Sequence, residues 1–377
     1  MNIFMNRSRR NGVWVRGAAL LVAAAVAAGT LARPVMADKG SKSLEKYERP
    51  VDQAIERALA WLAKNQTKED GSWTRWKGNQ RNVTGITSLC IMAFLAKGHT
   101  PGVGPYGEAI NKGIDFILLS QRPNGLLVYG ETGNGAMYCH SISTLMLAEV
   151  SGMVDPPRQK KLDAVLPKAL KAILAAQRMP KDPNNAGGWR YQIDSRDSDI
   201  SCTGWALMAL RSARNSGAVV PQESIDMAVS YVLRCQHRES GGFTYQPGGE
   251  PGWARTGTGV LCLELCGYHP SGPSQLHERS ALMGGEWILQ HLSHRYGEGE
   301  FFGYAMYYCA QATFQLGDEY WEKFAAQMYS IMLPAQDKEG FWPALPGNEG
   351  EGGEFYSTSM VILAMSVPYR QLPIYQR

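Results

Sequence analysis

The chain has 377 residues, 44% of them hydrophobic, and its 38 basic and 34 acidic residues give a formal net charge of +4. Five of the basic residues and none of the acidic ones lie in the first 37 positions, so the remainder carries 33 against 34. A near-neutral remainder excludes the strongly basic surface on which nucleic-acid binding depends, and we expect no nucleic-acid partner. Seven cysteines at irregular spacing in so long a chain exclude a small disulfide scaffold.

Residues 1–37 have the order of charge and hydrophobicity that is typical of a secretory signal peptide. Arg7, Arg9 and Arg10 precede an apolar, small-residue stretch over 17–32, and a small-x-small sequence ends at Ala37. This stretch has only 16 residues, which is short for a membrane span, although an uncleaved anchor is the alternative. We therefore expect export to the periplasm or the extracellular space and no membrane span in the mature chain.

Six similar units follow a linker predicted over 38–50 and fill the chain from 51 to 377. Each unit combines an amphipathic helix that ends at a glutamine, a glycine-rich turn with an aromatic residue, and a second, more apolar helix that ends at a glycine. The marker glutamines are Gln66, Gln121, Gln177, Gln236, Gln290 and Gln336. In chain order, the helix pairs are expected over 52–66 and 84–97, over 114–121 and up to 152, over 169–177 and 203–217, over 228–236 and 256–267, over 286–290 and 301–317, and over 324–336 and 357–367. The fifth unit is the least regular.

The two helices of a unit differ in charge, and this difference predicts two layers. First helices carry lysine, arginine and glutamate on one face, as over 52–57, whereas second helices, such as 86–96 and 202–210, have almost no charge. A helix that is apolar on all sides is buried on all sides, so the second helices form an inner layer. The sixth unit is as apolar as the third, which favours a closed ring over an open solenoid with polar end caps. The expected fold is all-α, with six helical hairpins in two concentric layers.

The glycine-rich turns after the marker glutamines resemble a motif of a known family of helical rings. Gln66 followed by Gly71-Ser72-Trp73, Gln177 followed by Gly187-Gly188-Trp189, and Gln336 followed by Gly340-Phe341-Trp342 resemble the QW motif of squalene and oxidosqualene cyclases. The resemblance spans residues 51 to 367 and implies the α/α-toroid of the terpenoid cyclases and protein prenyltransferases. We expect each glutamine to bond the free carbonyl groups at the end of its own helix while the aromatic ring packs across the turn. The motif is thus structural.

Asp197 and Asp199 are the candidate catalytic residues, just after the third QW-like turn. The segment resembles the Asp-x-Asp-Asp-Thr-Ala motif of class II terpene cyclases, whose middle aspartic acid protonates a double bond or an epoxide. Asp199 matches that middle position, and Ile200 stands where the motif has its last aspartate. The alternative is that Asp199 caps the following helix, as aspartate commonly does. The single ring also departs from the class II enzymes, which build their cavity between two helical domains.

No cofactor or metal is expected. Protein prenyltransferases hold zinc through Asp-x-Cys and a distant histidine, whereas this chain has Asp199 and Cys202 three positions apart. His291 and His294 have no patterned carboxylate near them that would complete a site.

Six further residues at or near the starts of the inner helices are predicted to bind substrate. Aromatic rings there would hold isoprenoid chains or other rings at the mouth of the cavity, although core packing explains most of them equally well. His140 is polar in an apolar context, with a core or capping histidine as the alternative. The candidates are Tyr138, His140, Trp205, Trp253, Tyr304 and Tyr307.

Two other segments are expected to be peripheral. The glycine-rich acidic loop over 347–354 is read as a solvated turn, and the tail from Val367 is expected to lie along the outer surface of the ring.

Three functions remain open on these grounds. The first is an exported toroid that binds an isoprenoid or other apolar ligand in its central cavity, with or without Asp-dependent cyclase activity. The second is a non-catalytic scaffold for a partner protein. The third is a carbohydrate-active toroid, which needs two carboxylates facing one cleft.

Overall fold

The computed structural model describes residues 43–74, 81–130, 132, 135–269, 272–273 and 275–376, all within the compact unit Met36–Arg377. The predicted signal peptide lies outside these residues. Among the described helices, none is long and apolar enough to cross a membrane.

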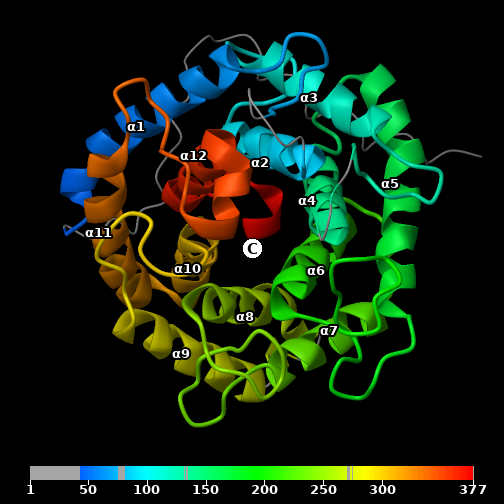
Figure 1. The fold of residues 1–377 in the computed structure, drawn as a ribbon, viewed down its shortest axis with the longest axis vertical. Helices are drawn as coiled ribbons and strands as arrows, with labels where there is room; N and C mark the ends of the chain where they lie inside the picture. Colours follow the sequence, from blue (N-terminus) through cyan, green and yellow to red (C-terminus); the bar gives the residue numbers. More distant parts are fainter. Residues whose placement is uncertain are drawn as a thin grey trace, which may run out of the picture. The chain divides into compact units, whose positions relative to one another are not determined.

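Twelve α-helices of the described residues alternate between an outer and an inner layer of a closed ring (Figure 1). The outer helices are α1 (Glu45–Lys64), α3 (Gly107–Leu119), α5 (Pro156–Gln177), α7 (Gln222–Arg234), α9 (Gln275–Gln290) and α11 (Asp318–Ala335). The inner helices are α2 (Val83–Ala96), α4 (Ala136–Glu149), α6 (Ile200–Asn215), α8 (Trp253–Cys266), α10 (Phe302–Leu316) and α12 (Gly353–Met365). The α/α-toroid predicted from the repeat is confirmed.

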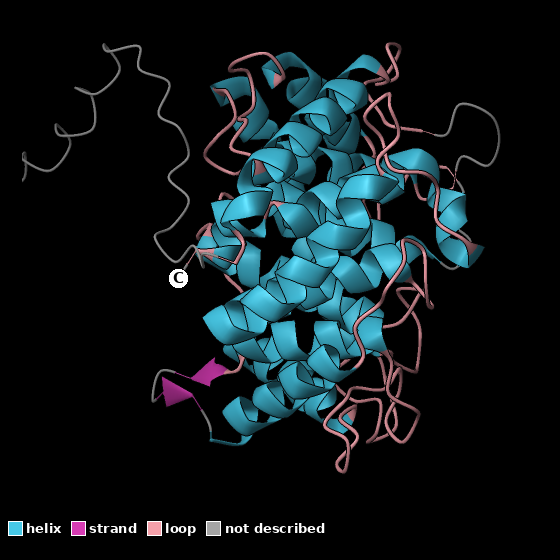
Figure 2. Ribbon diagram, turned by 90° about the vertical axis from the view of Figure 1, so that its left-hand side faces the viewer, coloured by secondary structure: helices cyan, strands magenta, loops and turns pink. Residues whose placement is uncertain are grey.

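Short elements complete the ring. Strands β1 (Tyr268–His269) and β2 (Gly272–Pro273) pair antiparallel after α8, and 3₁₀ turns η2 (Gly347–Gly352), η3 (Val367–Tyr369) and η4 (Pro373–Tyr375) flank α12. Figure 2 shows many of the connecting loops along one edge of the ring and the β1–β2 pair at the opposite edge.

Burial follows the charge pattern of the sequence. Every residue of α2 is buried, whereas α1 buries one face of six residues.

The first helix begins at Glu45, so the linker predicted over 38–50 is partly helical. Pro50 lies inside α1, in an exposed early turn where water can satisfy the carbonyl that proline leaves unpaired.

Five of the six marker glutamines join neighbouring units, and this differs from the role expected of them. Gln177 donates both hydrogens of its amide nitrogen, one to the carbonyl of Gly187 in its own turn and one to the carbonyl of Ser224 in the next outer helix, each at 2.8 Å. Gln66, Gln121, Gln236 and Gln336 make the same pair of bonds. The carbonyl near the end of the outer helix is instead taken by the indole N–H of the motif tryptophan, as Trp189 does with Ile173.

The sixth unit makes these bonds with the first, which closes the ring. Gln336 donates to the carbonyl of Ala54 in α1 at 2.8 Å, and the ring of Trp61 in α1 packs against Phe341 and Phe355 of the last unit. An open solenoid would leave these groups exposed at two ends.

The C-terminal tail fills the ring instead of lying along its outer surface as expected. Leu372, Ile374 and Tyr375 are buried, and the backbone N–H of Ile374 donates to the carboxylate of Glu149 at the end of α4. The red segment that follows α12 lies inside the ring of helices in Figure 1. The inner faces of six apolar helices leave apolar surface around the axis of the ring, and the buried apolar residues of the tail cover part of it.

Candidate ligand-binding site

A cavity of about 670 Å³ lies where the inner helices begin, and we call it the central pocket. Its buried part is aliphatic and aromatic, its wall carries five tyrosines, and its exposed or half-exposed rim is charged. The buried part comprises Ile86, Leu89, Ile142 and Trp205; the tyrosines are Tyr138, Tyr191, Tyr245, Tyr304 and Tyr356; the rim includes Arg81, Arg255, Glu300 and Glu351.

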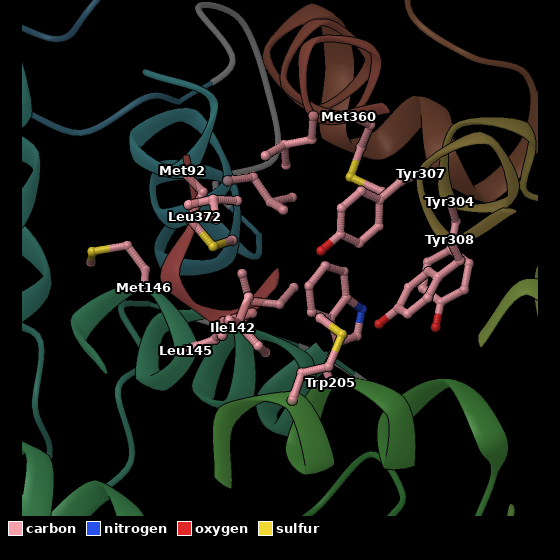
Figure 3. Close-up of a cluster of buried hydrophobic side chains, with 14 of the residues drawn as sticks. Met92, Ile142, Leu145, Met146, Trp205, Tyr304, Tyr307, Tyr308, Met360 and Leu372 are labelled. Carbon is pink, nitrogen blue, oxygen red and sulfur yellow. The ribbon is translucent and has the colours of Figure 1, made fainter. Parts of the chain in front are cut away.

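The deep end of the central pocket is closed by stacked rings that connect it to the tail. Trp205 stacks on Tyr307 with 5.5 Å between ring centres and 8° between planes, and the hydroxyls of Tyr307 and Tyr375 are hydrogen-bonded. Figure 3 shows Trp205, Ile142 and Leu372 in one cluster of buried side chains. The central pocket is therefore a cup, because this layer and the tail behind it close the axis of the ring.

Glu349 is the most buried carboxylate that lines the central pocket. Its oxygens accept hydrogen bonds from the backbone N–H groups of Gly303 and Tyr304, at 3.2 and 3.0 Å, and from the hydroxyl of Tyr356 at 2.8 Å. Glu349, which belongs to the sixth unit, thereby caps the start of α10 in the fifth unit. Burial raises the pKa of Glu349, and the three donors oppose this rise. Glu349 was not among the predicted site residues, because the many glycines of its loop indicated a solvated turn. The signal that could have found Glu349 is its position just before an inner helix, which it shares with Asp199.

Asp199 caps α6 and does not line the central pocket. One carboxylate oxygen accepts the backbone N–H of Cys202 at 2.8 Å, and the other lies 3.6 Å from the guanidinium of Arg190. Burial raises the pKa of Asp199 to about 6. Asp197 is half exposed and forms an ion pair with Arg190 at 2.7 Å. The geometry of Asp199 is therefore that of the helix cap, the alternative that the sequence left open beside the catalytic role.

The predicted substrate-binding residues divide into two groups. Tyr138, Trp205 and Tyr304 line the central pocket, whereas His140, Trp253 and Tyr307 do not. The Tyr307 ring lies behind Trp205, and the Trp253 ring packs between Phe302 and Phe324.

His140 has a structural role that explains its place in the repeat. Its Nδ1 accepts the backbone N–H of Leu127 at 3.0 Å, and its Nε2 lies 3.1 Å from the carbonyl of Ala169, which requires the proton on Nε2. In four other units, a threonine hydroxyl accepts the equivalent turn N–H, as Thr203 does from Trp189. Burial lowers the pKa of His140 to about 4, so the imidazole is neutral.

The chemistry of the central pocket is that of an apolar cup with hydroxyl and charged groups at its mouth. Burial raises the pKa values of Tyr138 and Tyr304, so their hydroxyls stay protonated. Arg255 and Glu300 form an ion pair at 3.0 Å across part of the rim. No group of three or more metal-ligating side chains occurs within the part of the chain that the structure describes.

Comparison with known families gives a match over most of the chain. The model of the prenyltransferase alpha-alpha toroid domain family matches residues 38–305 and 192–371. No protein with curated annotation matches the sequence.

Solved structures resemble the fold at low sequence identity. The GH76A alpha-1,6-mannanase from Salegentibacter sp. HEL1_6 is 12% identical, with a TM-score of 0.62 over 84% of this chain and 99% of that one. The type II terpene cyclase MstE from Scytonema is 15% identical, with a TM-score of 0.54 over 84% of this chain and 98% of that one. A protein from Actinoplanes is 14% identical, with a TM-score of 0.53 over 84% and 99% of the two chains. These likenesses concern the fold alone.

Proposed function

We propose that this chain, which belongs to the prenyltransferase alpha-alpha toroid domain family, binds an apolar ligand of isoprenoid type in its central pocket. The observation that carries the proposal is the closed, apolar deep end of a cavity of about 670 Å³. Ile142 and Trp205 are buried there and present aliphatic and aromatic surface. Burial of apolar surface is non-directional, so such an end accepts hydrocarbon chains and rings without requiring one exact shape.

The rim suits a polar end group on the same ligand. Arg81, Glu300 and Glu351 are exposed there, and the hydroxyls of Tyr191 and Tyr245 lie on the wall. A long apolar molecule with one hydroxyl or charged head can place its chain in the deep end and keep its head hydrated. A fully polar oligosaccharide would have to bury hydroxyl groups against Ile142 and Trp205, which costs free energy unless each is hydrogen-bonded.

Proton transfer from Asp199 is not part of this proposal. Its carboxyl lies behind the wall of the central pocket and is held by Cys202 and Arg190. Glu349 does line the pocket, and burial raises its pKa, but both of its oxygens accept hydrogen bonds, from two backbone N–H groups at the start of α10 and from the hydroxyl of Tyr356, that hold the carboxyl as a cap of that helix. We propose binding as the activity, in a protein that the signal-like N-terminus directs to export.

The test is isothermal titration of the chain from Asp38 onward with farnesol, geranylgeraniol and α-1,6-mannotriose. Ser201 lines the central pocket and is half-buried, so Ser201→Phe fills part of the cavity. Ser216 is exposed at the other end of the same helix, and Ser216→Phe is the matched control.

We expect saturable binding of an isoprenoid alcohol to the wild type and to Ser216→Phe, and a loss of at least about tenfold in Ser201→Phe. Binding of mannotriose instead, with the same sensitivity to Ser201→Phe, would replace the proposal with the carbohydrate alternative. Failure of both alcohols to bind would overturn it.

A further inference from the structure

A second cavity, of about 160 Å³, lies at the seam where the last unit meets the first, and we call it the seam pocket. Figure 1 shows α1 and α11 side by side there, and the start of α1, the end of α10 and η3 complete the walls. The seam pocket has no lining residue in common with the central pocket. Five of its lining residues are aromatic: Tyr47, Phe314, Trp321, Tyr329 and Tyr369.

The aromatic rings meet at steep angles and so form walls. Phe314 and Trp321 are 5.2 Å apart at 90°, Trp321 and Tyr329 are 6.3 Å apart at 86°, and Tyr47 and Tyr329 are 5.4 Å apart at 51°. Rings that only filled a core could pack in this way too, but here they surround a cavity. The π-faces of aromatic rings carry partial negative charge, which makes such a box attractive to a cation.

Two carboxylates at the mouth of the seam pocket also favour a cation. Glu48 of α1 and Asp318 at the start of α11 both line it, and both are exposed. The buried lining, which includes Val51 and Met365, is aliphatic and aromatic. A quaternary ammonium, whose surface is methyl groups, gives up no hydrogen bond on entering such a lining, whereas a primary ammonium gives up its bonds to water.

Arg370 adds a positive group at the edge of the same cavity. Its backbone has φ 49° and ψ 34°, a left-handed conformation that costs free energy in a residue other than glycine. The guanidinium lies over the Phe314 ring, 4.7 Å from its centre, and a guanidinium so placed still has N–H groups that can donate to an anion. The seam pocket therefore offers aromatic rings and carboxylates to a cation and an arginine to an acid group.

We propose that the seam pocket binds a small betaine-type zwitterion, with its quaternary ammonium between Tyr47, Trp321 and Tyr329 and its acid group on Arg370. Such a ligand has a cation for the carboxylates and aromatic rings, an acid group for the arginine, and methyl groups for the apolar lining. The site is independent of the function proposed for the central pocket, since the two cavities are lined by different residues.

The test compares glycine betaine with 3,3-dimethylbutanoate, which has the same shape and the same carboxylate but carbon in place of the charged nitrogen. Tetramethylammonium supplies the cation without the acid group, and phosphocholine supplies the headgroup of a lipid. Binding is measured by calorimetry on the chain from Asp38 onward.

Two variants address the charges separately. The pair Glu48→Gln with Asp318→Asn removes both carboxylates from the mouth, and Arg370→Asn removes the guanidinium while keeping a residue that tolerates the left-handed backbone. Glu319→Gln is the matched control, because Glu319 is the next residue of α11 and does not line the cavity.

We expect glycine betaine to bind at least about tenfold more tightly than 3,3-dimethylbutanoate, and the paired variant to lose most of this difference. Arg370→Asn should bring glycine betaine down to the affinity of tetramethylammonium, while Glu319→Gln and Ser201→Phe should bind as the wild type does. Tighter binding of phosphocholine than of glycine betaine would assign the site to a lipid headgroup. Equal binding of the two isosteres, no saturable binding by the wild type, or an unchanged Arg370→Asn would overturn the proposal.

Discussion

Glu149→Gln should stabilise the protein at pH 8 and leave its stability unchanged near pH 4. Glu149 is buried and accepts hydrogen bonds from the Ser212 hydroxyl and from the backbone N–H of Ile374 in the tail. Burial raises its pKa from the ordinary 4.5 to about 7. The folded state therefore binds the carboxyl proton of Glu149 more tightly than the unfolded chain does. The stabilisation that comes from this proton is complete below pH 4.5 and is lost as the pH rises through 7.

The size of the effect follows from this shift. A difference of 2.5 between the two values corresponds to about 3 kcal/mol, most of it lost between pH 5 and pH 8. Glutamine has nearly the same shape, and its amide can accept from Ile374 and donate to Ser212, so the variant keeps both contacts without the charge.

The assay is urea unfolding followed by tryptophan fluorescence at pH 4, 5 and 8. The free energy of unfolding of Glu149→Gln should exceed that of the wild type by up to about 3 kcal/mol at pH 8. Glu239→Gln, at an exposed turn position, is the control and should follow the wild type. Parallel pH profiles for Glu149→Gln and the wild type would refute the reasoning, because the carboxyl would then not be the group that titrates.

Three further outcomes are expected. Gln336→Leu removes the bonds to Ala54 and from Arg57 that join the last turn to α1, together with the bond to Gly340 within the turn, and should cost about 2 kcal/mol in urea unfolding, more than an exposed substitution such as Ser216→Phe. His140→Thr keeps an acceptor for its turn but loses the bond to Ala169; it should cost about 1–3 kcal/mol without changing farnesol binding in calorimetry. Asp199→Asn should change the unfolding free energy by less than about 1 kcal/mol and leave farnesol binding unchanged, since asparagine caps about as well and the carboxyl does not line the central pocket; a loss of farnesol binding would show that Asp199 reaches the ligand.

The architecture could be predicted from the sequence because the same short pattern of residues recurs in six units. The inner helices were recognisable from their lack of charge, and the marker glutamines located the turns correctly. What the glutamines bond was not predictable in the same way. The acceptors, such as Ser224 for Gln177, lie in the next unit at positions that carry no sequence signal, because any residue has a carbonyl group.

The site was only partly predictable for a related reason. Tyr138, Trp205 and Tyr304 were found because aromatic residues at the starts of inner helices face the cavity in several units. Glu349 was missed because composition describes a glycine-rich loop but not the helix that the loop covers. The structural role of His140, the alternative that the sequence left open, could not be preferred from the repeat, because threonine makes the same hydrogen bond in four other units and the residue type differs.

The bond from Gln336 to Ala54 joins positions 282 residues apart in the chain. Neighbouring units can pair as they are synthesised, but α1 receives its second neighbour only when the sixth unit exists. Contacts between such distant positions slow folding, because the chain must lose the entropy of a very long loop before they form. Open repeat arrays can fray from either end, whereas a ring has no end from which to fray. Loss of any one hairpin would break two interfaces at once, so we expect the ring to unfold in a single cooperative transition.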